Sequence, residues 1–106
     1  MVNAAQFWDA QADKYAKRPI ANETAYDATL DRTRYYLKDD QRVLEVGCGT
    51  GTTALRLCAA VREYVASDIS SGMIRIASEK AFEKGARNVA FTTAAVGEIA
   101  DKNMPF

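Results

Sequence analysis

Three glycines stand at every second position behind a short apolar run. Gly47, Gly49 and Gly51 follow residues 43–46 and precede a stretch of helix-forming residues, 52–57. Glycine adopts positive φ without strain, and it lets a ligand approach bare backbone. Because open α/β sheets bind their ligands beyond the carboxyl ends of the strands, this spacing predicts a ligand-binding loop.

Two nucleotide-binding motifs can be compared with this loop. A phosphate-binding P-loop ends in Gly-Lys-Ser or Gly-Lys-Thr, whereas Gly51 is followed by Thr52 and the loop contains no lysine. The dinucleotide fingerprint spaces its glycines by two and then by three residues, and here both spacings are two. The sequence therefore excludes the P-loop, and it disfavours an NAD-dependent oxidoreductase without removing that alternative.

Two acidic residues lie where they can recognise the same ligand. Asp68 ends the apolar segment 64–68, 21 residues after Gly47, where a carboxylate can accept hydrogen bonds from both hydroxyls of a ribose. Its alternative role is to cap the next helix, for which Ser70 is the better candidate. Glu45 interrupts an apolar strand, and a buried acid needs a partner. A cationic ligand and an arginine of the chain are both candidates.

The hydrophobic periodicity predicts two helices followed by alternating strands and helices. Asn3 with Gln6 has the pattern of a capping box, Asn22 can cap a second helix, and Gly85 can end the last one. The expected order is helix 3–16, helix 22–37, strand 43–46, helix 52–60, strand 64–68, helix 70–84 and strand 88–92. Such alternation gives a parallel sheet with right-handed crossovers. We expect one domain over residues 1–106, an α/β Rossmann-like parallel sheet with helices on both faces.

Composition narrows the class of protein. Fourteen basic and 14 acidic residues give a formal net charge of zero, which argues against nucleic acid as a partner. The apolar stretches are too short to span a membrane, and the N-terminus lacks the layout of a signal peptide. Cys48 and Cys58 fit neither a metal-binding spacing nor a disulfide framework, so we expect a cytoplasmic protein. The chain contains no histidine, and therefore neither a Ser-His pair nor a histidine general base. We also expect no metal site.

These residues resemble a known family. Residues 43–51, with the sequence VLEVGCGTG, resemble the first motif of class I S-adenosylmethionine-dependent methyltransferases. Residues 65–70, followed by Met73, are similar to the family's second-strand segment. Residues 7–9, Phe-Trp-Asp, resemble the leading helix of the small-molecule branch, although Phe7 and Trp8 themselves are expected to pack in the core.

The resemblance implies a role for each residue of the site. The three loop glycines would line the methionine and ribose parts of S-adenosylmethionine. Asp68 would hold the ribose hydroxyls and Glu45 would lie near the ammonium group. Alanine stands where the family carries an acid that accepts from the adenine amino group, so this contact is missing or is made by Glu98 as the acceptor. The further cofactor-binding candidates are Tyr15 and Arg18 at the methionine end, Cys48 in the loop, and Ile69, Met73, Ala95 and Val96 around adenine.

The resemblance also implies a sheet larger than this chain supplies. The family has seven strands in the order 3-2-1-4-5-7-6, and the sequence contains candidates for three, with residues 104–106 resembling the approach to the fourth. We expect the cofactor-binding half of a methyltransferase for a small-molecule acceptor, inactive by itself. Its first strand would be an exposed edge, which favours self-association. A non-catalytic cofactor-binding or assembly module is the alternative, and no general base can be assigned.

Overall fold

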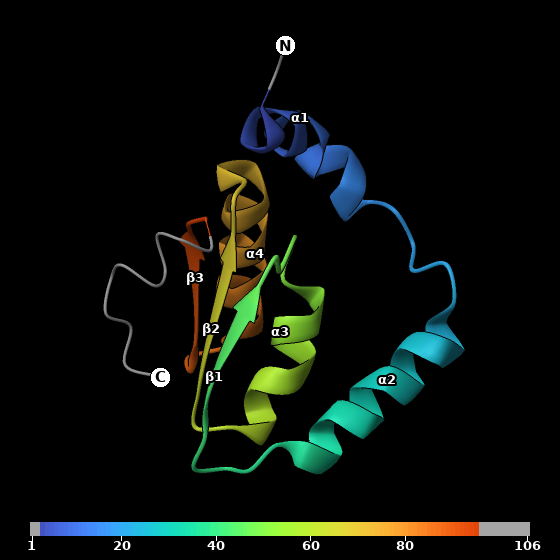
Figure 1. The fold of residues 1–106 in the computed structure, drawn as a ribbon, viewed down its shortest axis with the longest axis vertical. Coiled ribbons are helices and arrows are strands. Elements are labelled where there is room, and N and C mark those ends of the chain that lie inside the picture. The colour runs from blue at the N-terminus through green and yellow to red at the C-terminus, as the bar shows by residue number, and fades with distance from the viewer. Residues whose placement is uncertain (1–2, 96–106) are drawn as a thin grey trace.

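The computed structural model describes residues 3–95, which form four α-helices, one short 3-10 helix and three strands (Figure 1). Two helices precede the first strand, and strands and helices then alternate. The elements are α1 (Ala4–Ala16), α2 (Glu23–Tyr36), β1 (Arg42–Val46), α3 (Thr52–Leu57), η1 (Cys58–Ala60), β2 (Glu63–Asp68), α4 (Ser71–Lys84) and β3 (Val89–Thr93). The predicted order and type of the elements are confirmed.

The helix ends follow from local side-chain chemistry. Asn3 and Gln6 form the complete capping box of α1, since each side chain accepts from the other's backbone N–H. Asn22 accepts from the N–H of Ala25 at the start of α2, and Ser70 caps α4. Gly85 ends α4 with φ +67°, a conformation that glycine adopts without strain. All four predicted caps are confirmed.

One predicted helix divides in two. Residues 52–60 form α3 and then one turn of 3-10 helix, η1. The Asn88 side chain donates to the carbonyls of Cys58 (2.6 Å) and Val61 (3.1 Å), two carbonyls at the end of this segment. The Asn88 side chain therefore stabilises the end of this turn by hydrogen bonding. Asn88 itself lies one position before β3, whereas the sequence predicted that the strand begins at residue 88.

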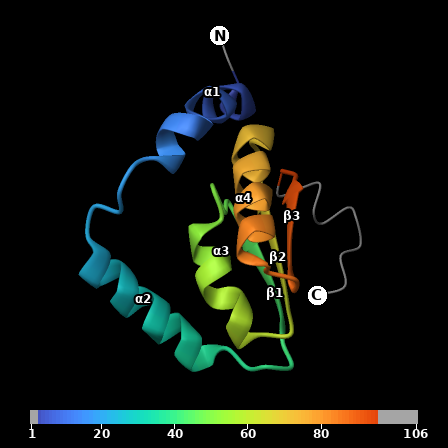
Figure 2. The same ribbon diagram turned by 180° about the vertical axis from the view of Figure 1, so that it is seen from behind.

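The three strands form a parallel sheet in the order β1-β2-β3. Each crossover helix leads to the next strand in the same direction, so right-handed connections place α3 and α4 on the same face. The core confirms this arrangement, because Ala54 of α3 and Ile74 of α4 both pack in one cluster with Tyr64 and Ala66 of β2. Figure 2 shows α4 in front of the strands.

The opposite face of the sheet differs from the sequence expectation. Within residues 3–95, helices cover one face only, because strand order and handedness send both crossovers to the same side. On the other face, Val46 at the end of β1 is 49% exposed. The α/β class and the parallel sheet are thus confirmed. Helices were expected on both faces of the sheet, and within the described residues they cover one face.

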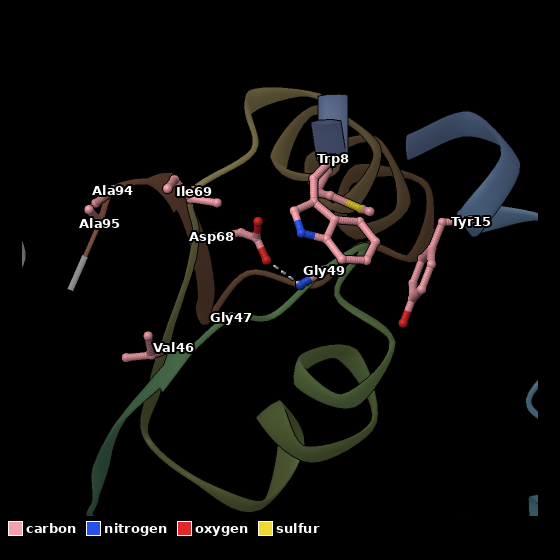
Figure 3. A pocket seen from close by; sticks show the side chains of 10 residues that line it. Trp8, Tyr15, Val46, Gly47, Gly49, Asp68, Ile69, Ala94 and Ala95 are labelled. Carbon is pink, nitrogen blue, oxygen red and sulfur yellow. Dashed lines mark hydrogen bonds between the residues drawn. The ribbon is translucent and has the colours of Figure 1, made fainter. Parts of the chain in front are cut away.

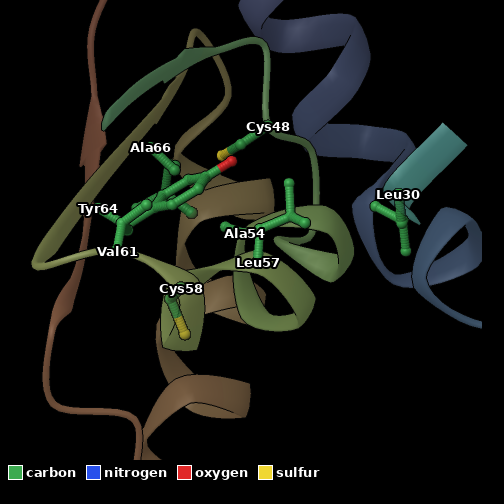
Figure 4. Packing of buried hydrophobic residues seen from close by; sticks show 9 residues of the cluster. Leu30, Cys48, Ala54, Leu57, Cys58, Val61, Tyr64 and Ala66 are labelled. Atoms are coloured by element: carbon green, nitrogen blue, oxygen red, sulfur yellow. The ribbon is translucent and has the colours of Figure 1, made fainter. Parts of the chain in front are cut away.

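The main core lies between the covered face of the sheet and α3 (Figure 4). Leu30 brings α2 into this core. The hydroxyl groups of Tyr26 and Thr53 lie 2.6 Å apart and join α2 to α3. The Arg56 guanidinium lies 5.0 Å from the centre of the Tyr26 ring, a cation–π arrangement that adds to this contact.

Candidate functional site

A cavity of ≈ 410 Å³ lies at the carboxyl ends of the strands, beneath α1 (Figure 3). Its wall combines side chains of α1 and α4, the ends of all three strands and the glycine loop. The lining residues are Trp8, Tyr15, Val46, Gly47, Gly49, Asp68, Ile69, Met73, Ala94 and Ala95. Seven of the twelve predicted cofactor-binding residues, Tyr15 included, therefore line this one cavity.

Gly47 and Gly49 present bare backbone to this cavity. Their φ angles are +76° and +57°, values that side-chain-bearing residues rarely adopt. A Cβ at Gly47 would meet no atom within 4 Å, and one at Gly49 would lie 3.8 Å from Cε1 of Tyr15. The space beside both residues is therefore open to a ligand rather than filled by the protein.

Gly51 has a different surrounding from the other two glycines. It does not line the cavity, and a Cβ there would lie 2.8 Å from Cζ of Phe91 and 2.9 Å from Cβ of Ala77. Its φ is +81°, directly before α3. Gly51 therefore allows α3 to begin close to α4 and β3. The sequence pattern treated the three glycines as one group. In the structure, two of them lie beside the cavity and the third lies where α3 packs against α4 and β3.

Asp68 fastens the glycine loop to the end of β2. Its Oδ2 accepts from the N–H of Gly49 and its Oδ1 accepts from the N–H of Ser70, each at 2.9 Å. Ser70, and not Asp68, accepts from the helix N–H of Met73, so the predicted cap of α4 is confirmed. Each Asp68 oxygen retains the capacity for a further hydrogen bond, and the carboxylate borders the cavity (Figure 3).

Glu45 has a partner that neither sequence alternative named. Its Oε1 accepts a 2.7 Å hydrogen bond from the Tyr64 hydroxyl, and Glu45 does not line the cavity. Burial raises the pKa of Glu45, the nearby Asp68 charge raises it further, and the Tyr64 hydrogen bond opposes both. The alternative of an arginine partner is thus replaced by a tyrosine, whose position in the next strand no local pattern reveals.

A second cavity of ≈ 380 Å³ lies on the other side of the loop, between the α1–α2 connection and the start of α3. Tyr15 lines both cavities. Arg18 lines only the second, with its guanidinium 5.9 Å from the centre of the Tyr15 ring. Cys48 also lies there, where burial and the charges of Glu45 and Asp68 raise the pKa of its thiol to about 12. Cys48 is therefore no nucleophile at neutral pH.

Apolar residues form the part of the first cavity beyond Asp68. Ile69, Met73 and Ala95 line it there, and Met73 is almost completely buried. Val96 and Glu98, the two other residues that the sequence proposed for this end, lie outside the described residues. The structure thus brings together three of the four residues predicted to surround adenine.

Trp8 is a lining residue that sequence reasoning assigned to the core. It is 38% exposed and borders the first cavity, and its neighbour Phe7 is 48% exposed. The expectation that both pack in the core is wrong, because the buried face of α1 is formed instead by Ala12. The rings of Trp8 and Tyr15 meet edge to face with centroids 6.0 Å apart. Their spacing of seven residues places both on one helix face, which was the available signal.

Within residues 3–95, no group of three or more potential ligands could hold a metal ion. No helix among those residues is long and apolar enough to cross a membrane.

Comparison with known proteins identifies the class to which this fold and cavity belong. Residues 43–106 match the family model of the methyltransferase domain. The chain belongs to the methyltransferase domain family.

Curated relatives agree with this assignment. The chain is 42% identical over 52 residues to the uncharacterized methyltransferase YcgJ of Bacillus subtilis strain 168, which covers 49% of this chain and 21% of that protein. It is 31% identical over 83 residues to the malonyl-[acyl-carrier protein] O-methyltransferase of Priestia megaterium, covering 76% of this chain and 28% of that protein. Over five such relatives the chain spans between 16% and 28% of their length.

Solved structures share the fold. The crystal structure of Bacillus subtilis YcgJ has a TM-score of 0.62 at 30% identity, covering 76% of this chain and 33% of that one. The DhpI–SAH complex has a TM-score of 0.70 at 28% identity, covering 85% and 42%. The [4+2]-cyclase SpnF has a TM-score of 0.74 over 96% of this chain and 43% of that one. At 24% identity this last likeness concerns the fold alone.

Proposed function

We propose that the first cavity binds S-adenosylmethionine, and that the chain is the cofactor-binding part of a methyltransferase acting on a small molecule. One observation carries the proposal: the open backbone at Gly47 and Gly49 and the carboxylate of Asp68 border the same cavity and are joined by a hydrogen bond. Membership in the methyltransferase domain family supports it, as does the likeness to a structure described as a complex with SAH.

The ribose and adenine fit the chemistry of this cavity. Asp68 already accepts one N–H on each oxygen, and each oxygen can accept one ribose hydroxyl in addition. Ile69, Met73 and Ala95 offer an apolar surface for a flat base. A volume of ≈ 410 Å³ lies within the roughly 300–1,000 Å³ that small-molecule cavities occupy.

The methionine part of S-adenosylmethionine fits the boundary between the two cavities. Tyr15 lines both, and Arg18 on the second side can pair with a carboxylate through its guanidinium. Glu45 lines neither cavity, so its proposed contribution is a negative charge behind the loop, which favours an ammonium group nearby. Cys48 contributes backbone to the loop and packing in the second cavity.

When bound, S-adenosylmethionine supplies a methyl group on a sulfonium centre that is itself the leaving group. The residues of this chain would contribute orientation, which in favourable reactions lowers the barrier by about 7–11 kcal/mol. Asp68 and the glycine backbone would fix the cofactor on one side, and Trp8 and Tyr15 would shield it from water on the other. We assign no general base.

A small molecule is the proposed methyl acceptor. The names of structural neighbours include an rRNA methylase at 18% identity and a PRMT1 complex at 25%, so the fold serves several acceptor classes. A net charge of zero disfavours an electrostatic surface for RNA. We also propose a cytoplasmic location, because both cysteines are free and buried, as in proteins of reducing compartments.

Calorimetric titration with S-adenosylhomocysteine, the demethylated product, tests the cofactor assignment. We expect binding of S-adenosylhomocysteine in preference to NAD. Asp68→Ala should weaken that binding by roughly 1.5–3 kcal/mol, the range for hydrogen bonds to a charged group. Asp39→Ala in the exposed turn before β1 is the matched control. Preferential binding of NAD, or unchanged affinity in Asp68→Ala, would contradict the proposal.

A further inference from the structure

The first turn of α4 is capped by a residue from another helix. Ser70 accepts from the N–H of Met73 (3.1 Å), whereas the N–H of Gly72 donates to Oδ1 of Asp9 on α1 (2.8 Å). The first turn of α4 contains no acidic residue of its own. A negative charge is stabilising at a helix N-terminus. Asp9 of α1 therefore supplies to the N-terminus of α4 the negative charge that the first turn of α4 itself lacks.

Asp9 is connected to the glycine loop by a short series of hydrogen bonds. The Ser70 hydroxyl donates to Oδ1 of Asp9, and the Ser70 N–H donates to Oδ1 of Asp68. The other oxygen of Asp68 then accepts from the N–H of Gly49 (Figure 3). Ser70 is fully buried, so its hydroxyl and its N–H must find hydrogen-bond partners within the protein, and the carboxylates of Asp9 and Asp68 supply them. A displacement of Asp9 is therefore transmitted to Asp68 through one fixed residue.

The buried apolar part of the contact between α1 and α4 is small. Its buried apolar residues are Ala12, Met73 and Ile76, which form a cluster separate from the main core. A Cβ on Gly72 would lie 3.1 Å from Cβ of Ala12, so the two helices approach closely. An ion pair between Asp13 and Arg75 (3.1 Å) lies on the exposed side of this contact.

We propose that Asp9 is a positioning residue for the first cavity. Its carboxylate fixes α1, so that Trp8 and Tyr15 form one wall, and it fixes Ser70, whose N–H holds Asp68. Hydrogen bonds from Ser70 and then Gly72 lower the pKa of Asp9, as expected for an ionised carboxylate that accepts these bonds. The inference rests on the proposed function for the identity of the ligand, but not for the effect on the loop.

Asp9→Ala and Asp13→Ala form a matched pair that tests this role. Both remove a carboxylate from α1 that contacts α4, but only Asp9 contacts Ser70. We expect Asp9→Ala to raise the Kd for S-adenosylhomocysteine by about tenfold or more, and Asp13→Ala by less than about fivefold, as for an exposed ion pair. In the ligand-free chain, the Gly49 amide should exchange its hydrogen faster in Asp9→Ala only, measured by NMR.

Asp9→Asn provides a milder variant in case Asp9→Ala does not fold. The amide keeps an acceptor oxygen for Ser70 and Gly72 but removes the charge at the α4 N-terminus, so we expect the Kd to rise about two- to fivefold. Equal Gly49 exchange and equal Kd in the Asp9 and Asp13 variants would overturn the proposal. A chain that binds no S-adenosylhomocysteine at all would instead contradict the proposed function, while Gly49 exchange would still decide the role of Asp9.

Discussion

Gly47 and Gly51 have almost the same backbone conformation in very different surroundings. Their φ angles are +76° and +81°, so alanine at either position should cost about 1–2 kcal/mol in the left-handed region. Only at Gly51 does the added Cβ meet Phe91 and Ala77, which should cost a further 1–3 kcal/mol or so through overpacking. Urea unfolding of Gly47→Ala and Gly51→Ala measures the difference, and equal losses would contradict it.

Glu45 gives the molecule a predictable dependence on pH. Burial, and then the charge of Asp68, raise its pKa above the ordinary value of 4.5. Between pH 4.5 and the higher folded pKa, the folded chain keeps a proton that the unfolded chain has lost. The free energy of unfolding contributed by Glu45 is therefore full below pH 4.5 and falls as pH rises through this interval.

Glu45→Gln tests this dependence while keeping an oxygen that can accept from the Tyr64 hydroxyl. We expect the variant to be more stable than the unsubstituted chain at pH 7, with the difference shrinking toward pH 4, in urea unfolding at both pH values. A variant that is less stable at pH 7 would show that the ionised carboxylate contributes favourably in the folded chain. The same substitution should weaken S-adenosylhomocysteine binding if the charge of Glu45 serves the ammonium group.

The site residues that could be predicted from the sequence are those that belong to a local pattern. Gly47 and Gly49 were recognised by their spacing, and Asp68 was recognised by its position at the end of a strand. Trp8 and Asp9 could not be assigned, because their surroundings are created when α1 docks on α4, whose first residues lie about 60 positions away. The Tyr64 partner of Glu45 depends in the same way on pairing between strands.

At the level of elements, local chemistry determined most of the boundaries. Asn3, Asn22, Ser70 and Gly85 each act within one turn of their own helix, so their effect can be read from the sequence. The coverage of the sheet could not be read in this way. It depends on strand order, and three strands in succession place both crossover helices on one face.

A part-buried polar contact between Tyr26 and Thr53 helps to dock α2 on α3. Tyr26→Phe removes the hydroxyl that lies 2.6 Å from Thr53 Oγ1 but leaves the ring under Arg56. We expect a loss of about 0.5–1.5 kcal/mol in the free energy of unfolding. Tyr35→Phe, on the same helix with a side chain 82% exposed, should change it by less than about 0.5 kcal/mol. Equal effects of the two variants in urea unfolding would contradict this role for Tyr26.

For the molecule as a whole, the sheet leaves β1 at an edge. In residues 3–95, β1 pairs only with β2, and an unpaired edge is a template for another strand. We expect the chain to self-associate, measured by light scattering across a concentration series. Leu44→Lys on β1 should reduce the association, whereas Ala28→Lys, at an exposed position of α2, adds the same charge away from the edges of the sheet. A monodisperse monomer at all concentrations would contradict this expectation.

The separation between Asp9 and Ser70 has a consequence for synthesis of the chain. The two residues are 61 positions apart, and ribosomes add about 5–20 residues each second. Helix α1 therefore leaves the ribosome about 3–12 s before the residues that receive it. During that interval its aromatic side chains have no docking surface, and its helical conformation depends on the capping box of Asn3 and Gln6. Chaperones that bind exposed aromatic residues would meet this segment before α4 is available to cover it.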